Sequence, residues 1–96
     1  MYIEILVCYD ITSNKARRKL VKELKDIGLH NVQESVFWGR ILPSELKSIQ
    51  RVFEEVLNKS EDKAFVVRTN FSNTVKEFSF GYPNPDIFKE RDYEIV

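Results

Sequence analysis

The segment formed by residues 3–20 constrains the fold more than any other part of the chain. An apolar run, Ile-Glu-Ile-Leu-Val-Cys-Tyr, stops at Asp10 and is followed by Ile-Thr-Ser-Asn, where Thr, Ser and Asn are residue types that cap helices. The pattern predicts a strand over residues 2–9 that leads into a helix over residues 13–27. Gly28 then stands where a left-handed residue would end that helix.

The rest of the 96 residues predicts a single α+β domain. Strand-like patterns cover residues 32–41, 63–71 and 74–80. A second helix, opened by Leu-Pro-Ser, is expected over residues 42–58, where apolar residues recur at helical spacing: Leu46, Ile49, Phe53, Val56 and Leu57. Taken literally, the element order is βαβαββ.

The first strand is apolar on both faces beyond Glu4. One face carries Ile3, Ile5, Val7 and Tyr9, and the other carries Leu6 and Cys8. Two helices cover only one face of a sheet, and a monomer of this size rarely exposes a large apolar patch. The pattern therefore predicts a homodimer packed through the open face.

Asp10 is predicted to lie at a strand end beside a basic helix. The whole chain has fifteen basic and fifteen acidic residues, but residues 11–25 have a local charge of +5, with Glu23 opposing a set that we name the basic stripe: Lys15, Arg17, Arg18, Lys19, Lys22 and Lys25. This arrangement favours a carboxylate that holds a metal beside cations that hold phosphates. The alternative is an Asp that forms a turn and a solvated helix face. In a homodimer, two such carboxylates could share a divalent ion.

Other site types lack support in the sequence. Cys8 is the single cysteine and His30 the single histidine, so zinc ligation and Cys/His nucleophilic chemistry are not indicated. No apolar run approaches the ~20 residues needed to span a bilayer, and no positive leader is present. We therefore expect a cytoplasmic protein without a membrane segment.

Several motifs resemble one known family. Leu-Val-Cys-Tyr-Asp-Ile at residues 6–11, Lys15 with Arg-Arg-Lys-Leu at 17–20, Gly-Leu at 28–29 and Val-Gln-Glu-Ser-Val-Phe at 32–37 are similar to the CRISPR-associated endoribonuclease family. This family is the small subunit of the CRISPR adaptation machinery, and the resemblance covers residues 1–70. It implies a ferredoxin-like βαββαβ fold, so the predicted strand over residues 32–41 would break around Gln-Glu-Ser. It also implies a homodimer with a strand-end Asp from each subunit on a divalent metal, Mg²⁺ or Mn²⁺.

Carried over residue by residue, the resemblance makes Asp10 the metal ligand, with Tyr9, Arg17, Ser35 and Phe37 in supporting catalytic positions. The predicted nucleic-acid contacts are Lys15, Arg17, Arg18, Lys19 and Lys22. Simpler roles stay open, because the two aromatic residues could be core or interface residues, the serine could relieve a bend and the arginine could pair with a carboxylate. Many relatives have an Arg just before the Val-Gln pair, where this chain has Asn31.

Three functions therefore stand. The chain could be a metal-dependent nuclease acting on RNA or double-stranded DNA. It could be a DNA-binding scaffold that engages an integrase subunit in the spacer-integration complex, or a toxin-like ribonuclease that acts alone. Residues 1–81 are predicted to form the domain, and residues 82–96, where Pro83 and Pro85 favour extended backbone, an arm exchanged between subunits as an extra strand.

Overall fold

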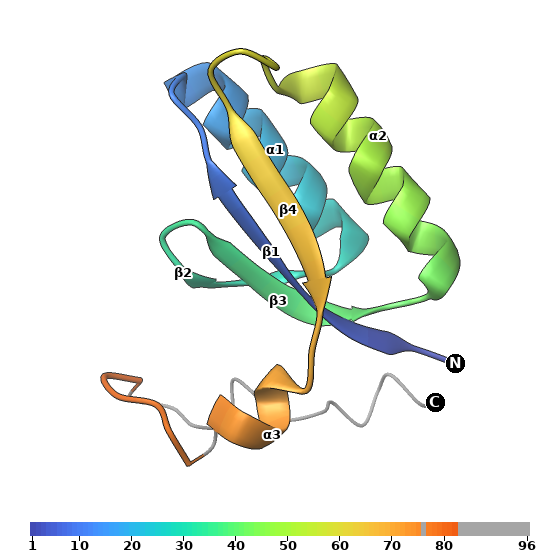
Figure 1. Cartoon of the computed structure of the whole chain (residues 1–96), viewed down its shortest axis with the longest axis vertical. Helices are drawn as coiled ribbons and strands as arrows, with labels where there is room; N and C mark the ends of the chain where they lie inside the picture. The colour runs from blue at the N-terminus through green and yellow to red at the C-terminus, as the bar shows by residue number, and fades with distance from the viewer. Residues whose placement is uncertain (76, 83–96) are drawn as a thin grey trace.

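The computed structural model describes residues 1–75 and 77–82 and has the element order βαββαβ followed by a short helix (Figure 1). The elements are β1 (Ile3–Asp10), α1 (Asn14–Ile27), β2 (His30–Gln33), β3 (Val36–Ile41), a 3₁₀ turn (Pro43–Glu45), α2 (Leu46–Val56), β4 (Lys63–Arg68) and α3 (Phe71–Val75). No helix within these described residues is long and apolar enough to cross a membrane.

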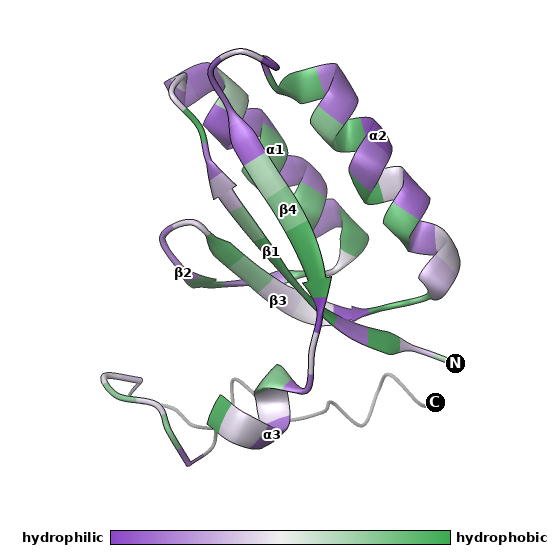
Figure 2. Ribbon diagram, in the orientation of Figure 1, coloured by the Kyte–Doolittle hydropathy of each residue, from purple (hydrophilic) through white to green (hydrophobic). Residues whose placement is uncertain are grey.

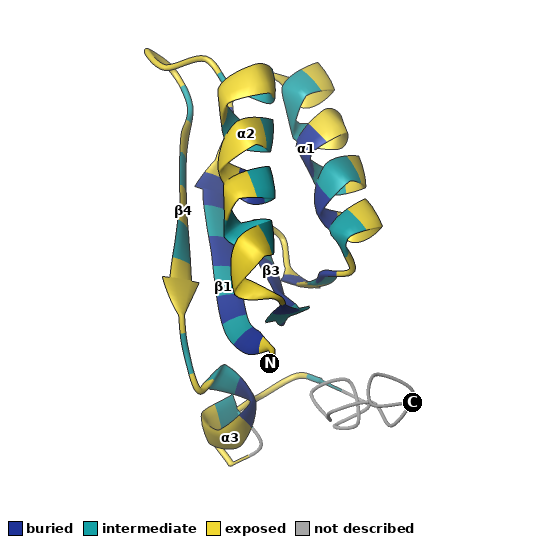
Figure 3. Cartoon of the chain, turned by 90° about the vertical axis from the view of Figure 1, so that its right-hand side faces the viewer, coloured by how far each residue is buried: buried dark blue, intermediate teal, exposed yellow. Residues whose placement is uncertain are grey.

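The four strands form an antiparallel sheet in the order β2-β3-β1-β4. This order, with α1 and α2 together on one face, confirms the predicted ferredoxin-like α+β sandwich (Figures 1 and 3). Strand β1 is central, and its last residue, Asp10, lies opposite Lys63 of β4. The end of the first strand thus lies beside the start of β4.

The core lies between the sheet and the two long helices. Residues of β1 alternate between buried and half-buried positions, as the period of a strand requires (Figure 3). Ile5 and Val7 are fully buried on the helix side, where they meet Leu20, Leu24 and Ile49. Both helices alternate polar and apolar residues along their length, so each presents one apolar side to the sheet (Figure 2).

Local signals define the ends of α1. The Ser13 side chain accepts a hydrogen bond from the Ala16 amide at 3.2 Å, which selects one cap among the three candidates in the sequence. Gly28 has φ of 110° and its amide donates to the last carbonyls of the helix, which confirms the predicted stop. These two caps fix where the basic stripe begins and ends.

The predicted segment over residues 32–41 breaks into a hairpin, as the resemblance implied. Glu34 and Ser35 form the turn, and the register shifts between Asn31 and Gln33. The Asn31 side-chain amide donates to the carbonyls of Gln33 at 2.6 Å and Val36 at 3.1 Å. An amide at position 31 therefore holds the irregular part of this hairpin.

The predicted strand over residues 74–80 is wrong. The chain leaves the sheet after Arg68 and turns into α3, which holds Phe71 against Trp38 at 6.1 Å between ring centroids. Phe71 and Val75 of α3 pack onto the second face of the sheet, whereas Phe78 and Phe80 are exposed, so the apolar alternation of this segment does not belong to a strand. Of the predicted exchanged arm only Tyr82 lies within the described residues; the extra strand lies outside them.

Candidate metal and nucleic-acid site

Asp10 lies on the sheet face that α1 and α2 leave open. Side chains alternate along β1, so this carboxylate shares a face with Leu6 and Cys8, opposite the buried Val7 and Tyr9. Asp10 is exposed, and its partner across the ladder, Lys63, is exposed too. A carboxylate and an ammonium group are thus placed side by side at one end of the sheet.

The loop after Asp10 is held by the carboxylate of Asp62, which lies 50 positions after Thr12 in the chain. Asp62 Oδ1 accepts a hydrogen bond from the Thr12 amide at 3.0 Å, and its Oδ2 accepts one from the Asn58 amide at 2.9 Å. These two backbone hydrogen bonds lower the pKa of Asp62 below its ordinary value of 3.8. Asp62 therefore ties the start of β4 to the loop that connects Asp10 to α1.

Arg17 reaches back from the first turn of α1 to the same loop. Its Nη2 donates to the Ile11 carbonyl at 2.7 Å, and its Nη1 donates to the Asn14 side chain. Both of these acceptors are neutral, and no carboxylate lies within ion-pair distance of Arg17 among the described residues. Its guanidinium charge is therefore fixed in position without being neutralised.

Tyr9 and Phe37 pack together on the core side of the sheet. Their ring centroids are 6.2 Å apart, and the Phe37 side chain is fully buried. Burial raises the pKa of the Tyr9 hydroxyl, the nearby Arg17 charge lowers it, and Glu34 raises it. Tyr9 is therefore close enough to Arg17 for the positive charge to act on its hydroxyl. Phe37 is a core residue in this structure.

Ser35 contributes its backbone to this end of the sheet. Its carbonyl accepts a hydrogen bond from the Tyr9 amide at 3.1 Å, so the hairpin turn is attached to the residue before Asp10. The turn thus extends the β1–β3 ladder by one contact. The structure brings Tyr9, Asp10, Arg17 and Ser35 to the same end of the molecule.

The basic stripe lies along the outer side of α1. Lys15, Arg18, Lys19 and Lys22 are exposed, and a shallow hollow on the helix is lined by Arg17, Arg18, Val21, Lys22, Lys25 and Asp26. Lys22 pairs with Asp26 at 3.0 Å, with both side chains largely exposed. Such a pair contributes little to stability, so it leaves the lysine available to a phosphate.

One protomer supplies a single carboxylate at this site. Within residues 1–75 and 77–82, no group of three or more His, Cys, Asp or Glu side chains could together hold a metal ion. Divalent cations such as Mg²⁺ require several oxygen ligands, of which water can supply some. Asp10 fits a shared ion because it is exposed on the open face, where a second copy could bring a second carboxylate.

The open face has an exposed apolar half. Phe65 and Val67 of β4 are 59% and 43% exposed and lie across the ladder from Cys8 and Leu6. On the other half, Trp38 is 4% exposed because α3 covers it. The uncovered apolar half is thus on the β4 side, continuous with Asp10 and Lys63.

Sequence reasoning missed Lys63 and Asp62. Both are far from Asp10 along the chain, and only the pairing register of β1 with β4 brings them together. Their signal was an acidic and a basic residue at the start of a predicted strand, which many exposed strand ends share. Neither composition nor spacing could assign them to this site.

The fold and the site define a ferredoxin-like α+β protein with an acidic strand end beside a basic helix. A family model described as CRISPR associated protein Cas2 matches residues 1–76, and the chain belongs to this family. A protein of Francisella tularensis subsp. novicida, named CRISPR-associated endoribonuclease Cas2 1, is 43% identical over 89 residues, covering 93% of this chain and 90% of the relative.

Other relatives extend the comparison. A Thermoproteus tenax protein named CRISPR-associated endonuclease Cas1/endonuclease Cas2 fusion is 32% identical over 67% of this chain, which spans 25% of that longer protein. Among solved structures, a hypothetical protein TT1823 of Thermus thermophilus matches with a TM-score of 0.67 and 28% identity, covering 72% of this chain and 83% of its own. Streptococcus pyogenes Cas2 gives the same TM-score at 24% identity, covering 74% of this chain and 93% of its own, which supports the fold.

Proposed function

We propose that this chain is a CRISPR adaptation subunit that works as a homodimer, binds DNA in a spacer-integration complex and hydrolyses phosphodiester bonds in RNA or duplex DNA. The observation that carries the proposal is the position of Asp10, exposed on the open sheet face beside an apolar surface. A two-fold related copy packed on that surface would bring two such carboxylates together. The endoribonuclease name of the Francisella relative supports the nuclease part.

In this proposal each side chain has a separate task. The two Asp10 carboxylates hold Mg²⁺ or Mn²⁺, and the fixed, un-neutralised charge of Arg17 attracts the phosphodiester. When bound, the ion supplies activation of a water molecule and stabilisation of charge on the phosphate. The basic stripe positions the nucleic-acid backbone, and Lys63 adds one more cation beside the carboxylate.

A scaffold without nuclease activity is the second candidate, and Asn31 favours it. Where the family resemblance implies an arginine, this chain has Asn31, whose side-chain amide donates to two backbone carbonyls of the hairpin. The site thus lacks one cation that would stabilise a phosphodiester under attack. In the scaffold role, the dimer binds DNA through the basic stripe and engages an integrase partner. The name of the Thermoproteus relative, which joins Cas1 and Cas2, supports such a partner. A toxin-like ribonuclease would need no such partner.

The nuclease proposal predicts that Asp10→Asn abolishes magnesium-dependent cleavage. The substitution removes the ligand charge at nearly constant volume, and Asp10 is exposed, so folding and dimerisation should persist. Wild type and variant are incubated with single-stranded RNA and duplex DNA, with magnesium and with a chelator. Glu55→Gln on the exposed side of α2 is the matched control.

Two outcomes separate the candidates. Cleavage that requires both magnesium and Asp10 selects the enzyme. Full cleavage by Asp10→Asn in a contaminant-free preparation contradicts the catalytic assignment, and an absence of cleavage in wild type selects the scaffold.

DNA binding through the basic stripe is tested by charge reversal. Replacing Lys15, Arg18 and Lys22 by Glu should weaken duplex DNA binding and flatten its salt dependence, because fewer counterions are released. Each lost phosphate contact should reduce the slope of log K against log salt by roughly 0.9. The control reverses three exposed cations elsewhere: Lys47, Arg51 and Lys59. Equal losses in both variants would restore the solvated-face interpretation of the stripe.

A further inference from the structure

Two acidic residues of β1 lie on the open face of the sheet, and each has a cation directly opposite it. Glu4 pairs across the ladder with Arg40 of β3. At the other end of the strand, Asp10 pairs with Lys63 of β4. Residues directly opposite each other in an antiparallel ladder point to the same face, with Cβ atoms roughly 5 Å apart. The register therefore brings one carboxylate and one cation together at each end of the open face.

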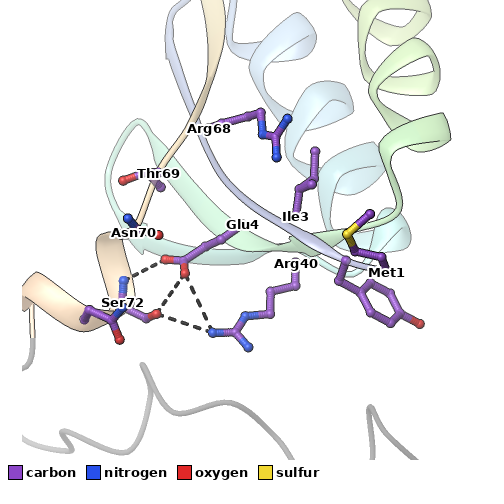
Figure 4. Close-up of a pocket in the computed structure, with 10 residues that line it drawn as sticks. Met1, Ile3, Glu4, Arg40, Arg68, Thr69, Asn70 and Ser72 are labelled. Atoms are coloured by element: carbon purple, nitrogen blue, oxygen red, sulfur yellow. Dashed lines mark hydrogen bonds and ion pairs between the residues drawn. The ribbon is translucent and has the colours of Figure 1, made fainter.

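The pair at the Glu4 end belongs to a closed polar network. Glu4 Oε2 accepts hydrogen bonds from Trp38 Nε1 at 2.8 Å and the Ser72 amide at 2.6 Å, and Oε1 accepts one from the Ser72 hydroxyl at 2.8 Å (Figure 4). Arg40 Nη2 lies 3.7 Å from the same carboxylate. Glu4 is therefore saturated and offers little to a further cation.

The pair at the Asp10 end is open. Asp10 and Lys63 are both exposed, and within residues 1–75 and 77–82 neither side chain makes a hydrogen bond or an ion pair. The two charged groups are thus neighbours on one face, and each is free to bind a ligand or to turn to the other.

Lys63 is the one cation of β4 on this face. Arg68, at the other end of the strand, lies opposite the buried Ile5, so its side chain is on the helix-covered face and extends away from Glu4 (Figure 4). The charge that β4 places beside Asp10 is therefore the ammonium group of Lys63.

This ammonium group and a metal ion would neutralise the same carboxylate. A divalent ion on Asp10 would lie roughly 6 Å from the ammonium group, and their repulsion in a water-like dielectric corresponds to about a tenfold loss of metal affinity. The long lysine side chain can also turn away from the ion, which reduces the loss. Lys63 thus acts against metal binding, in contrast to an added carboxylate.

We infer that Lys63 competes with the divalent cation for Asp10. Its ammonium group neutralises the carboxylate when no metal is bound, and the metal binds by displacing it. The inference rests on the proposed function, in which Asp10 is the metal ligand, and it gives Lys63 control over how readily that site is loaded.

Manganese binding to the full-length protein tests this competition without a cleavage assay. Free Mn²⁺ is followed by its electron paramagnetic resonance signal during a titration at constant ionic strength and without nucleic acid. Lys63→Gln should bind Mn²⁺ at least threefold more tightly than wild type, because the competing charge is gone. Lys63→Arg keeps the charge and should stay within twofold of wild type. Lys47→Gln removes an exposed lysine of α2 and controls for net charge.

A double variant assigns the gain to Asp10. Asp10→Asn, alone or combined with Lys63→Gln, should bind Mn²⁺ weakly and to the same extent. The gain of Lys63→Gln over wild type should also shrink as salt is added, because exposed charges are screened.

Two results would overturn the inference and leave Asp10 as the metal ligand. One is equal Mn²⁺ affinity of Lys63→Gln and wild type, together with weak binding by Asp10→Asn. The other is a gain from Lys63→Gln that persists when Asp10 is replaced. Equal affinity of Asp10→Asn and wild type would instead contradict the proposed metal site, and the inference would fall with it.

Discussion

At the scale of single residues, Asp62 connects the stability of the chain to the geometry of its site. Its two carboxylate oxygens accept from the Thr12 and Asn58 amides, so one side chain secures the loops on both sides of the Asp10 end. The lowered pKa means that the folded chain binds this proton less readily than the unfolded chain. The contribution of ionised Asp62 to the stability of the fold is therefore complete at pH values above its ordinary pKa of 3.8. It is lost as the pH falls through the lowered pKa of the folded chain.

We expect Asp62→Asn to lower stability at neutral pH and to flatten its decline in acid. An asparagine has one acceptor oxygen, so one of the two amides loses its partner. Urea unfolding followed by Trp38 emission at pH 7 and in acidic steps measures both effects. The control, Glu61→Gln, removes a neighbouring exposed carboxylate without changing the acceptor of either amide. The difference in its free energy of unfolding between neutral and acidic pH should stay close to that of wild type.

At the scale of elements, the attachment of α3 is the feature that distinguishes the two halves of the open face. The five-residue helix is too short to be stable by itself and is held by Glu4, whose side chain is 11% exposed, and by Phe71 against Trp38. Without this attachment the apolar Trp38 would be uncovered.

Glu4→Ala should therefore destabilise the fold by about 2–4 kcal/mol, because it removes the acceptor of the Trp38 indole and leaves the half-buried Arg40 without its carboxylate. Ser72→Ala removes one hydroxyl donor and keeps the amide contact, so we expect it to destabilise the fold by about 1 kcal/mol. Chemical denaturation gives both values. A loss for Glu4→Ala no larger than that for Ser72→Ala would show that the network does not hold α3.

Most of the elements were predictable because their signals are local. Ser13 and Gly28 determine the ends of α1 through their own caps, and the apolar residues over 46–57 recur at the spacing of a helix. The strand prediction over residues 74–80 failed at its start because α3, which extends to Val75, is held by Glu4, a contact made across most of the chain. For the same reason Asp10 was found from its position after an apolar run, whereas Lys63 and Asp62 were not.

At the scale of the whole molecule, the proposed homodimer determines whether the carboxylates meet. Phe65 is 59% exposed in one protomer, so Phe65→Asp should be tolerated by the fold. Two-fold symmetry would place two such charges in the interface, so the variant should sediment as a monomer. Phe65→Leu keeps the surface apolar and should remain dimeric. A dimeric Phe65→Asp protein would mean that the copies meet elsewhere, and the arm over residues 82–96 would become the next region to test.

The central place of β1 has a consequence for how the chain is made. Of the four strands of the sheet, β1 is synthesised first, and it pairs on one side with β3 and on the other with β4, which is synthesised last. Its second edge and much of its apolar surface stay uncovered until Arg68 has been synthesised. Non-local pairing of this kind slows folding and exposes edges to wrong partners. The strand that presents the candidate site is therefore begun first and completed last.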